Sequence, residues 1–176
     1  ALFNTTTSNY NIALGNNALY CNISGNTNIA LGVNAAKCQV SGLGNITFGN
    51  RVGFAATDGD NNILMGCCTA RLMTCGNRNI IMGCCAGYNN QSGDNNTLVG
   101  ARAGKNLTTG YKNVMIGFDA GCGNTTGYCN VYLGAAAAGG FSNGRHNFIA
   151  GYQAGYTGNG ASHNLIIGQM AFNMAV

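Results

Sequence analysis

The chain has 176 residues and little charge: eight Lys or Arg against four Asp or Glu give a net charge of +4. The basic residues are dispersed, so the sequence lacks the basic patch of a nucleic-acid-binding surface. No apolar run approaches the roughly 20 residues of a membrane span. These features exclude nucleic acid as an expected partner and a transmembrane segment as an expected element.

One spacing organises the whole sequence. Asparagine recurs ten times at intervals of 17 residues, at Asn11, Asn28, Asn45, Asn62, Asn79, Asn96, Asn113, Asn130, Asn147 and Asn164. A glycine follows each of them four positions later, at Gly15, Gly32, Gly49, Gly66, Gly83, Gly100, Gly117, Gly134, Gly151 and Gly168. A register without insertions indicates coils stacked on copies of themselves. We predict one domain over residues 1–176, with an incomplete repeat at 1–10. Both ends lie within a repeat, which predicts further sequence beyond them.

Each repeat contains one short predicted strand. With the asparagine as position 1, positions 2 and 4 are apolar throughout, except for Thr97 at position 2. This alternation is the period of a strand. The glycine at position 5 ends it, so we predict strands of about four residues from 11–14 to 164–167. A second glycine stands at position 15 from Gly25 to Gly144, which predicts a second bend. With 29 glycines in the chain, no helix is expected, because each glycine costs about 1 kcal/mol relative to alanine.

The predicted fold is an all-β parallel β-solenoid (β-roll) of ten 17-residue coils, stacked about 4.8 Å apart. Stacking aligns the asparagines into a ladder of side-chain amides, and it aligns positions 2, 4 and 8 into apolar rows. Position 8 is mostly alanine, which predicts a thin interior with little room opposite the larger side chains. Low charge and a high content of Asn, Gly, Ser and Thr are also compatible with disorder, but apolar residues kept in phase argue against it.

The nine cysteines include three pairs at equivalent positions of adjacent coils, namely Cys21 and Cys38, Cys67 and Cys84, and Cys68 and Cys85. Such residues lie within the Cα separation that a disulfide accepts, and each bridge would add about 3 kcal/mol in the chain-entropy model. The alternative is that they fill a ladder as small apolar residues. Cys75, Cys122 and Cys129 have no stacked partner and could cross-link chains. The vicinal pairs should point to opposite faces if extended, and no C-x-x-C occurs, so we predict no metal site.

The segment at positions 10–14 varies most between repeats. Of the N-x-S/T sequons, Asn22, Asn90 and Asn124 share position 12 of this segment and are the favoured candidates for glycosylation. Aromatic and basic residues also gather there, with Tyr111 and Tyr128 following at position 16. They suit either contacts with a host-surface glycan or protein, or packing between parallel rods.

Catalytic and cofactor signatures are missing from the sequence. His146 and His163 are expected to stack as a surface ladder without a third metal ligand. Asp60 and Asp94 share position 16 two coils apart, about 10 Å, but structural placement at a turn is favoured over an acid–base pair. No nucleophile–base motif, phosphate loop or calcium-binding nonapeptide occurs. The threonine row at position 13 is too broken for an ice-binding face. We predict no enzymatic activity, no cofactor and no catalytic residue.

The segment N-Φ-x-Φ-G-x-x-A resembles the head repeat of trimeric autotransporter adhesins, whose core is S-V-A-I-G-x-x-A. The closest matches are residues 11–18, Asn-Ile-Ala-Leu-Gly-Asn-Asn-Ala, and residues 28–35, Asn-Ile-Ala-Leu-Gly-Val-Asn-Ala. Similar Asn/Gly-rich copies occur in tail-fibre and spike proteins of phages and other viruses. The resemblance implies a left-handed parallel β-roll, a trimer of chains and binding to host surfaces.

The sequence favours a structural role. We predict the shaft or subunit of an extracellular or virion fibre, located outside the cell, on a cell surface or on a virion. Its expected partner is itself, as a homo-oligomer or an end-to-end filament, because exposed coil ends are open sheet edges. The first alternative is a host-surface or glycan-binding adhesin or tail-fibre module. A hexapeptide-type acyltransferase is more remote, because the coil has two bends rather than three equal faces.

Overall fold

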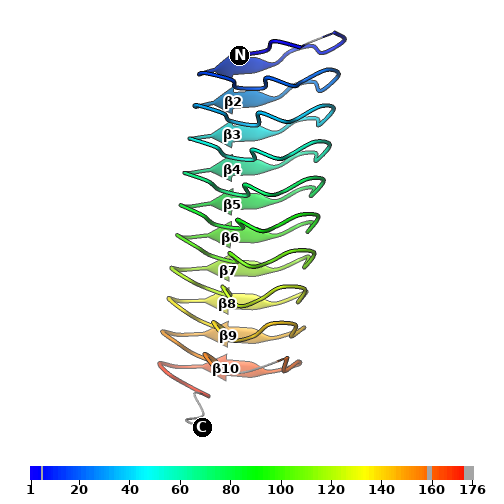
Figure 1. Ribbon diagram of the computed structural model, residues 1–176. Coiled ribbons are helices and arrows are strands. Elements are labelled where there is room, and N and C mark those ends of the chain that lie inside the picture. Colours follow the sequence, from blue (N-terminus) through cyan, green and yellow to red (C-terminus); the bar gives the residue numbers. More distant parts are fainter. Residues whose placement is uncertain (5, 158–159, 173–176) are drawn as a thin grey trace.

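The chain forms a rod of stacked coils. The computed structural model describes residues 1–4, 6–157 and 160–172, and these residues contain no helix. Each coil contributes one three-residue strand: β1 Ile12–Leu14, β2 Ile29–Leu31, β3 Ile46–Phe48, β4 Ile63–Met65, β5 Ile80–Met82, β6 Thr97–Val99, β7 Val114–Ile116, β8 Val131–Leu133, β9 Phe148–Ala150 and β10 Leu165–Ile167. The strands form one parallel sheet in chain order (Figure 1). The predicted β-solenoid is therefore confirmed, while its handedness stays a prediction.

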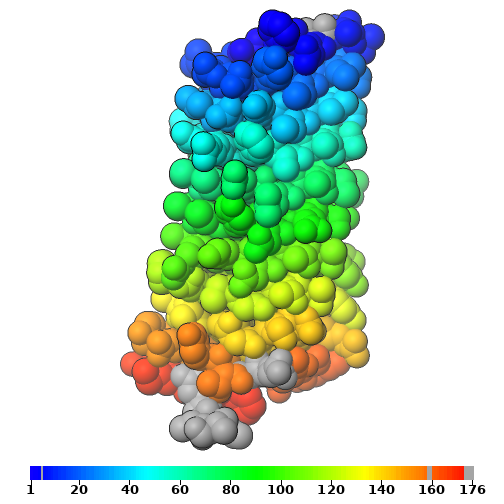
Figure 2. All heavy atoms as spheres, viewed as in Figure 1, coloured from blue at the N-terminus to red at the C-terminus, as the bar shows by residue number. Residues whose placement is uncertain are grey.

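Every strand pairs with the next at the repeat interval. Ile63 lies opposite Ile80, and Ile80 lies opposite Thr97, so like positions stack from β1 to β10. The backbone bonds between coils run along the rod axis, as in the bond from the Ile80 amide to the Asn96 carbonyl oxygen of 2.8 Å. The result is a rod of nearly even width (Figure 2).

The side of the sheet that faces the interior differs from the prediction. Position 3, the middle residue of each strand, points inward, and Leu64, Ile81 and Leu98 are buried there. Positions 2 and 4 point outward, because successive side chains of a strand alternate between its two faces. The asparagine at position 1 points inward with position 3. The prediction that positions 2 and 4 line the interior is therefore wrong, whereas the alanines of position 8 are buried as expected.

The ten asparagines form a continuous ladder that is buried from Asn28 to Asn147 and half-buried at Asn11 and Asn164. Asn79 is representative: its side-chain amide donates to the Asn62 side-chain oxygen at 3.1 Å and to the Gly93 carbonyl oxygen at 2.8 Å. Its own side-chain oxygen accepts the backbone N–H of Asn96 at 2.9 Å. Gly93 stands at position 15, so each asparagine from Asn11 to Asn147 joins the start of its coil to the end of that coil, and the ladder also joins neighbouring coils.

Position 5 requires glycine for its backbone conformation as well as for the close approach of the next coil, whereas position 15 requires it for the close approach alone. At position 5 the backbone has a positive φ, +132° at Gly83, which few L-residues adopt. At position 15 the reason is space, because a Cβ on Gly76 would lie 2.7 Å from the Gly93 carbonyl oxygen. From the fourth to the ninth coil, position 3 is large and position 9 is Gly or Ala: a Cβ on Gly121 would lie 2.8 Å from the Tyr132 ring. The interior thus keeps a near-constant volume by pairing large with small side chains.

Tyr132 gives the rod a predicted sensitivity to alkali. Its side chain is fully buried, and burial raises the pKa of its hydroxyl above the ordinary value, with the amides of Asn147 and Asn124 opposing the rise only partly. Above about pH 10 the unfolded chain ionises first, so stability is full below that pH and falls above it by about 1.4 kcal/mol per pH unit. Denaturant unfolding at pH 9 and pH 11 should show a smaller loss for Tyr132→Phe. Equal losses in both proteins would contradict this origin.

Candidate interaction surface

The outer side of the sheet is an apolar surface, here called the apolar face, in which Thr97 is the single polar residue. It consists of positions 2 and 4 of all ten coils: Ile12, Ile29, Ile46, Ile63, Ile80, Thr97, Val114, Val131, Phe148 and Leu165, with Leu14, Leu31, Phe48, Met65, Met82, Val99, Ile116, Leu133, Ala150 and Ile167. None carries a charge. Phe48 is 51% exposed and Leu14 is 70% exposed. A row of this length extends about 43 Å along the rod, and large continuous apolar patches of this kind mark interaction sites.

A hollow lies at the N-terminal end of the apolar face. Its volume is about 360 Å³, and Leu14, Leu31 and Phe48 line it together with Gly32, Gly49 and Asn50. Gly32 and Gly49, both at position 5, leave space in the hollow because they have no side chain. The lining offers little hydrogen-bonding capacity, so the hollow suits an apolar side chain of a partner better than a sugar.

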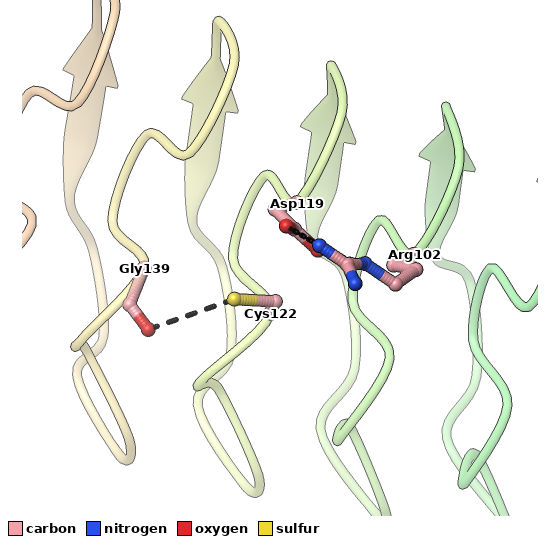
Figure 3. Close-up of polar contacts among 4 residues, drawn as sticks. All are labelled: Arg102, Asp119, Cys122 and Gly139. Atoms are coloured by element: carbon pink, nitrogen blue, oxygen red, sulfur yellow. Dashed lines mark hydrogen bonds and ion pairs between the residues drawn. The ribbon is translucent and has the colours of Figure 1, made fainter.

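The edge beside the apolar face is polar and partly charged. Here the Arg102 side chain reaches across to the next coil, where its Nε donates to Asp119 at 2.7 Å and its Nη2 forms an ion pair with the same carboxylate (Figure 3). The guanidinium also lies 4.8 Å from the centroid of the exposed Phe118 ring. Three residues after Asp119 in the same coil, the Cys122 thiol donates weakly to the Gly139 carbonyl oxygen at 3.9 Å (Figure 3). Burial raises the pKa of that thiol.

Two stacks of rings and cations run along the rod away from the apolar face. In the first, Arg71 lies 5.8 Å from the rings of both Phe54 and Tyr88 and donates to the Tyr88 hydroxyl at 2.6 Å. In the second, Tyr111 and Tyr128 stack with their centroids 4.9 Å apart.

The second stack continues through the histidines. The His146 ring contacts Tyr128 edge-on, and His163 stacks on His146 at 5.1 Å. Ring faces that cover one another offer less area to a sugar, so this geometry favours a structural role for most of these aromatic residues.

The predicted glycosylation sites are buried. Asn22, Asn90 and Asn124 are each 0% exposed. Their side-chain oxygens accept the backbone N–H three residues later, at 3.0 Å from Gly25, 2.8 Å from Gly93 and 2.8 Å from Gly127. The prediction that position 12 is accessible is therefore wrong, because this position points into the interior and closes the second bend.

Asp60 and Asp94 accept backbone hydrogen bonds from the coil that precedes each of them. Asp60 accepts the Leu43 backbone N–H at 2.8 Å, and Asp94 accepts that of Asn77 at 2.7 Å. Both therefore have the structural placement that was favoured over an acid–base pair. Within the part of the chain that the structure describes, no three His, Cys, Asp or Glu side chains are placed to hold one metal ion, and no helix could cross a membrane.

All nine cysteines are free thiols. Cys21 and Cys38 interact with each other, and burial raises the pKa of Cys38. The vicinal pairs differ from the prediction, because Cys67 and Cys68 point to the same side with their sulfurs 3.7 Å apart. The physical reason is a positive φ of 54° at Cys68, which breaks the alternation of an extended chain.

Comparison with known proteins finds no match: no family model, no curated protein and no solved structure matches the chain.

Proposed function

We propose that the chain is the shaft or subunit of an extracellular or virion fibre, and that its apolar face packs laterally against a second copy of the same chain. The apolar face is the observation that carries the proposal. It exposes large side chains such as Phe48 and Ile116. Covering them with a partner would stabilise the complex by about 25 cal/mol for each Å² of apolar surface removed from water.

A second copy is the partner that fits best, because the two faces would have the same period. Ridges of side chains that repeat every coil can interdigitate along the full length only with grooves of equal spacing. The absence of charge at positions 2 and 4 also means that two copies meet without like-charge repulsion.

The test is the mass of the native protein over a range of concentrations, with electron microscopy and image averaging of the same samples. We expect masses at multiples of 18.0 kDa and rods joined side by side, with or without end-to-end growth. A protein that stays monomeric at every concentration would overturn lateral packing. Monomeric single rods that bind glycans in a screen would instead support the alternative of a glycan-binding adhesin module.

A charge on the apolar face should weaken association. Ile80→Lys places an ammonium group in the interface, and we expect at least tenfold weaker association, because burying an unpaired charge costs well over 1.4 kcal/mol. Leu72→Lys is the matched control, since Leu72 is 39% exposed and Ile80 is 40% exposed, but Leu72 lies at position 11, away from the apolar face. Equilibrium sedimentation measures both. If the two variants weaken association equally, the interface lies elsewhere.

A further inference from the structure

Four thiols lie together on adjacent coils at the edge of the apolar face. Cys67 and Cys68 follow β4, and Cys84 and Cys85 follow β5. The sulfurs are 3.7 Å apart within each pair. The Cys85 backbone N–H donates to the Cys67 carbonyl oxygen at 2.9 Å, which fixes one pair above the other. Cys67 and Cys84 are exposed, and the other two are half-buried.

The backbone holds each pair in a chelating arrangement. Cys68 and Cys85 have φ values of 54° and 56°, in the left-handed region that costs a non-glycine residue about 1–2 kcal/mol. This conformation turns neighbouring side chains to one side, whereas an extended chain would separate them. The same conformation recurs at position 7 of the other coils, for example at Arg51 and Arg102. The fold therefore imposes it, and the two thiols of a pair do not have to be ordered when a ligand binds.

The sulfur separation matches a shared ligand. Two thiolates bound to one centre at about 2.3 Å each lie about 3.3–3.8 Å apart, the smaller value at a pyramidal centre and the larger at a tetrahedral one, and the 3.7 Å within each pair falls in this range. A disulfide needs a separation of only about 2.0 Å. No third ligand is placed to complete a closed site within the described residues. The arrangement therefore suits a centre that takes two sulfurs from the chain and brings its remaining substituent with it.

We propose that Cys67–Cys68 and Cys84–Cys85 are two independent dithiol sites for thiophilic centres, of which a monosubstituted trivalent arsenical is the defining ligand class. With an arsenoxide, both S–H bonds and the As=O bond break, and two As–S bonds form. The oxygen leaves as water with both protons, and no atom changes oxidation state. The step therefore needs no oxidant. The sites are independent of the proposed fibre, because neither oligomerisation nor a partner enters the chemistry.

The probe is phenylarsine oxide, added to the reduced full-length chain and followed by intact-mass spectrometry under native conditions. All measurements use a Cys21→Ser background, because Cys21 and Cys38 also interact and could bind a further arsenical between coils. We expect two adducts per chain, each heavier by the probe minus one water. Cys75→Ser should leave both adducts in place, because Cys75 has no vicinal thiol.

Two double variants distinguish pairing within a coil from pairing between coils. Cys67→Ser with Cys84→Ser removes one thiol of each vicinal pair, so we expect no adduct, whereas pairing between coils would retain one on Cys68 and Cys85. Cys67→Ser with Cys68→Ser leaves one vicinal pair, so we expect one adduct, whereas pairing between coils would give none. The opposite pattern, or no adduct on the folded parent, overturns the proposal. Thermal unfolding by circular dichroism checks that each variant is folded.

Discussion

Gly83→Ala is expected to destabilise the rod by about 4 kcal/mol or more, the range reached only by severe steric or backbone defects. Gly83 has a φ of +132°, and a Cβ there would lie 2.5 Å from the Gly100 carbonyl oxygen and 2.6 Å from its carbon. Backbone atoms cannot rotate away as a flexible side chain can. The two adjacent coils that contain β5 and β6 would have to separate at this contact. The backbone hydrogen bonds between these coils would weaken as a result.

Gly168→Ala separates the two causes of this effect. Gly168 also stands at position 5 and has a φ of +125°, but among the described residues a Cβ there would meet only the Ala171 Cβ at 3.7 Å. This variant therefore carries backbone strain without the clash, and we expect a loss of about 1–3 kcal/mol. Urea unfolding gives both values, and hydrogen exchange locates the weakened coils. Equal losses would show that the close approach of the coils contributes nothing.

Asn79→Ala is expected to cost about 2–5 kcal/mol. Asn79 is fully buried, and its removal leaves the Gly93 carbonyl and the Asn96 N–H without the partners they have at 2.8 and 2.9 Å. Each unsatisfied buried group costs about 1–3 kcal/mol. Thermal and urea unfolding measure the loss.

Asn11→Ala is the control for the ladder. Asn11 donates to the Gly25 carbonyl oxygen at 2.8 Å and accepts the Asn28 N–H at 2.9 Å, but it is only half-buried. Water can replace part of the hydrogen bonding that the Asn11 side chain provides, so the loss of stability should be smaller than for Asn79→Ala. A value as large as that of Asn79→Ala would mean that burial does not set the cost, and no change at Asn79 would contradict a stabilising ladder.

The strand positions could be predicted because the 17-residue spacing alone determines which residues of adjacent coils stack on one another. The inward face could not, because both candidates are apolar: Ile81 at position 3 and Met82 at position 4 are equally suited to a core. The asparagine resolves the choice. Its amide must reach the Gly93 carbonyl oxygen across the interior, and position 3 points to the same side as position 1. Hydrogen bonding, rather than hydrophobicity, therefore sets the orientation of the sheet.

The geometry of the vicinal thiols was missed for a similar reason. An extended chain would turn Cys67 and Cys68 to opposite faces, but position 7 has a positive φ in coil after coil. The sequence held one signal for this bend, since Asn17 and Asn34 occupy position 7 in the first two full coils and asparagine tolerates the left-handed region. Later coils place Arg, Cys, Asp and Gln there, which hides the signal from propensity alone.

The alignment of the backbone bonds with the rod axis has a mechanical consequence. Tension along the rod acts directly on the bonds between coils, such as that from the Ile80 amide to the Asn96 carbonyl oxygen, while the chain still connects every coil to the next. A coil that detaches would release about 55–60 Å of extended chain in place of its stacked rise of about 4.8 Å. The rod can thus lengthen under load one coil at a time, absorbing energy at each step without breaking.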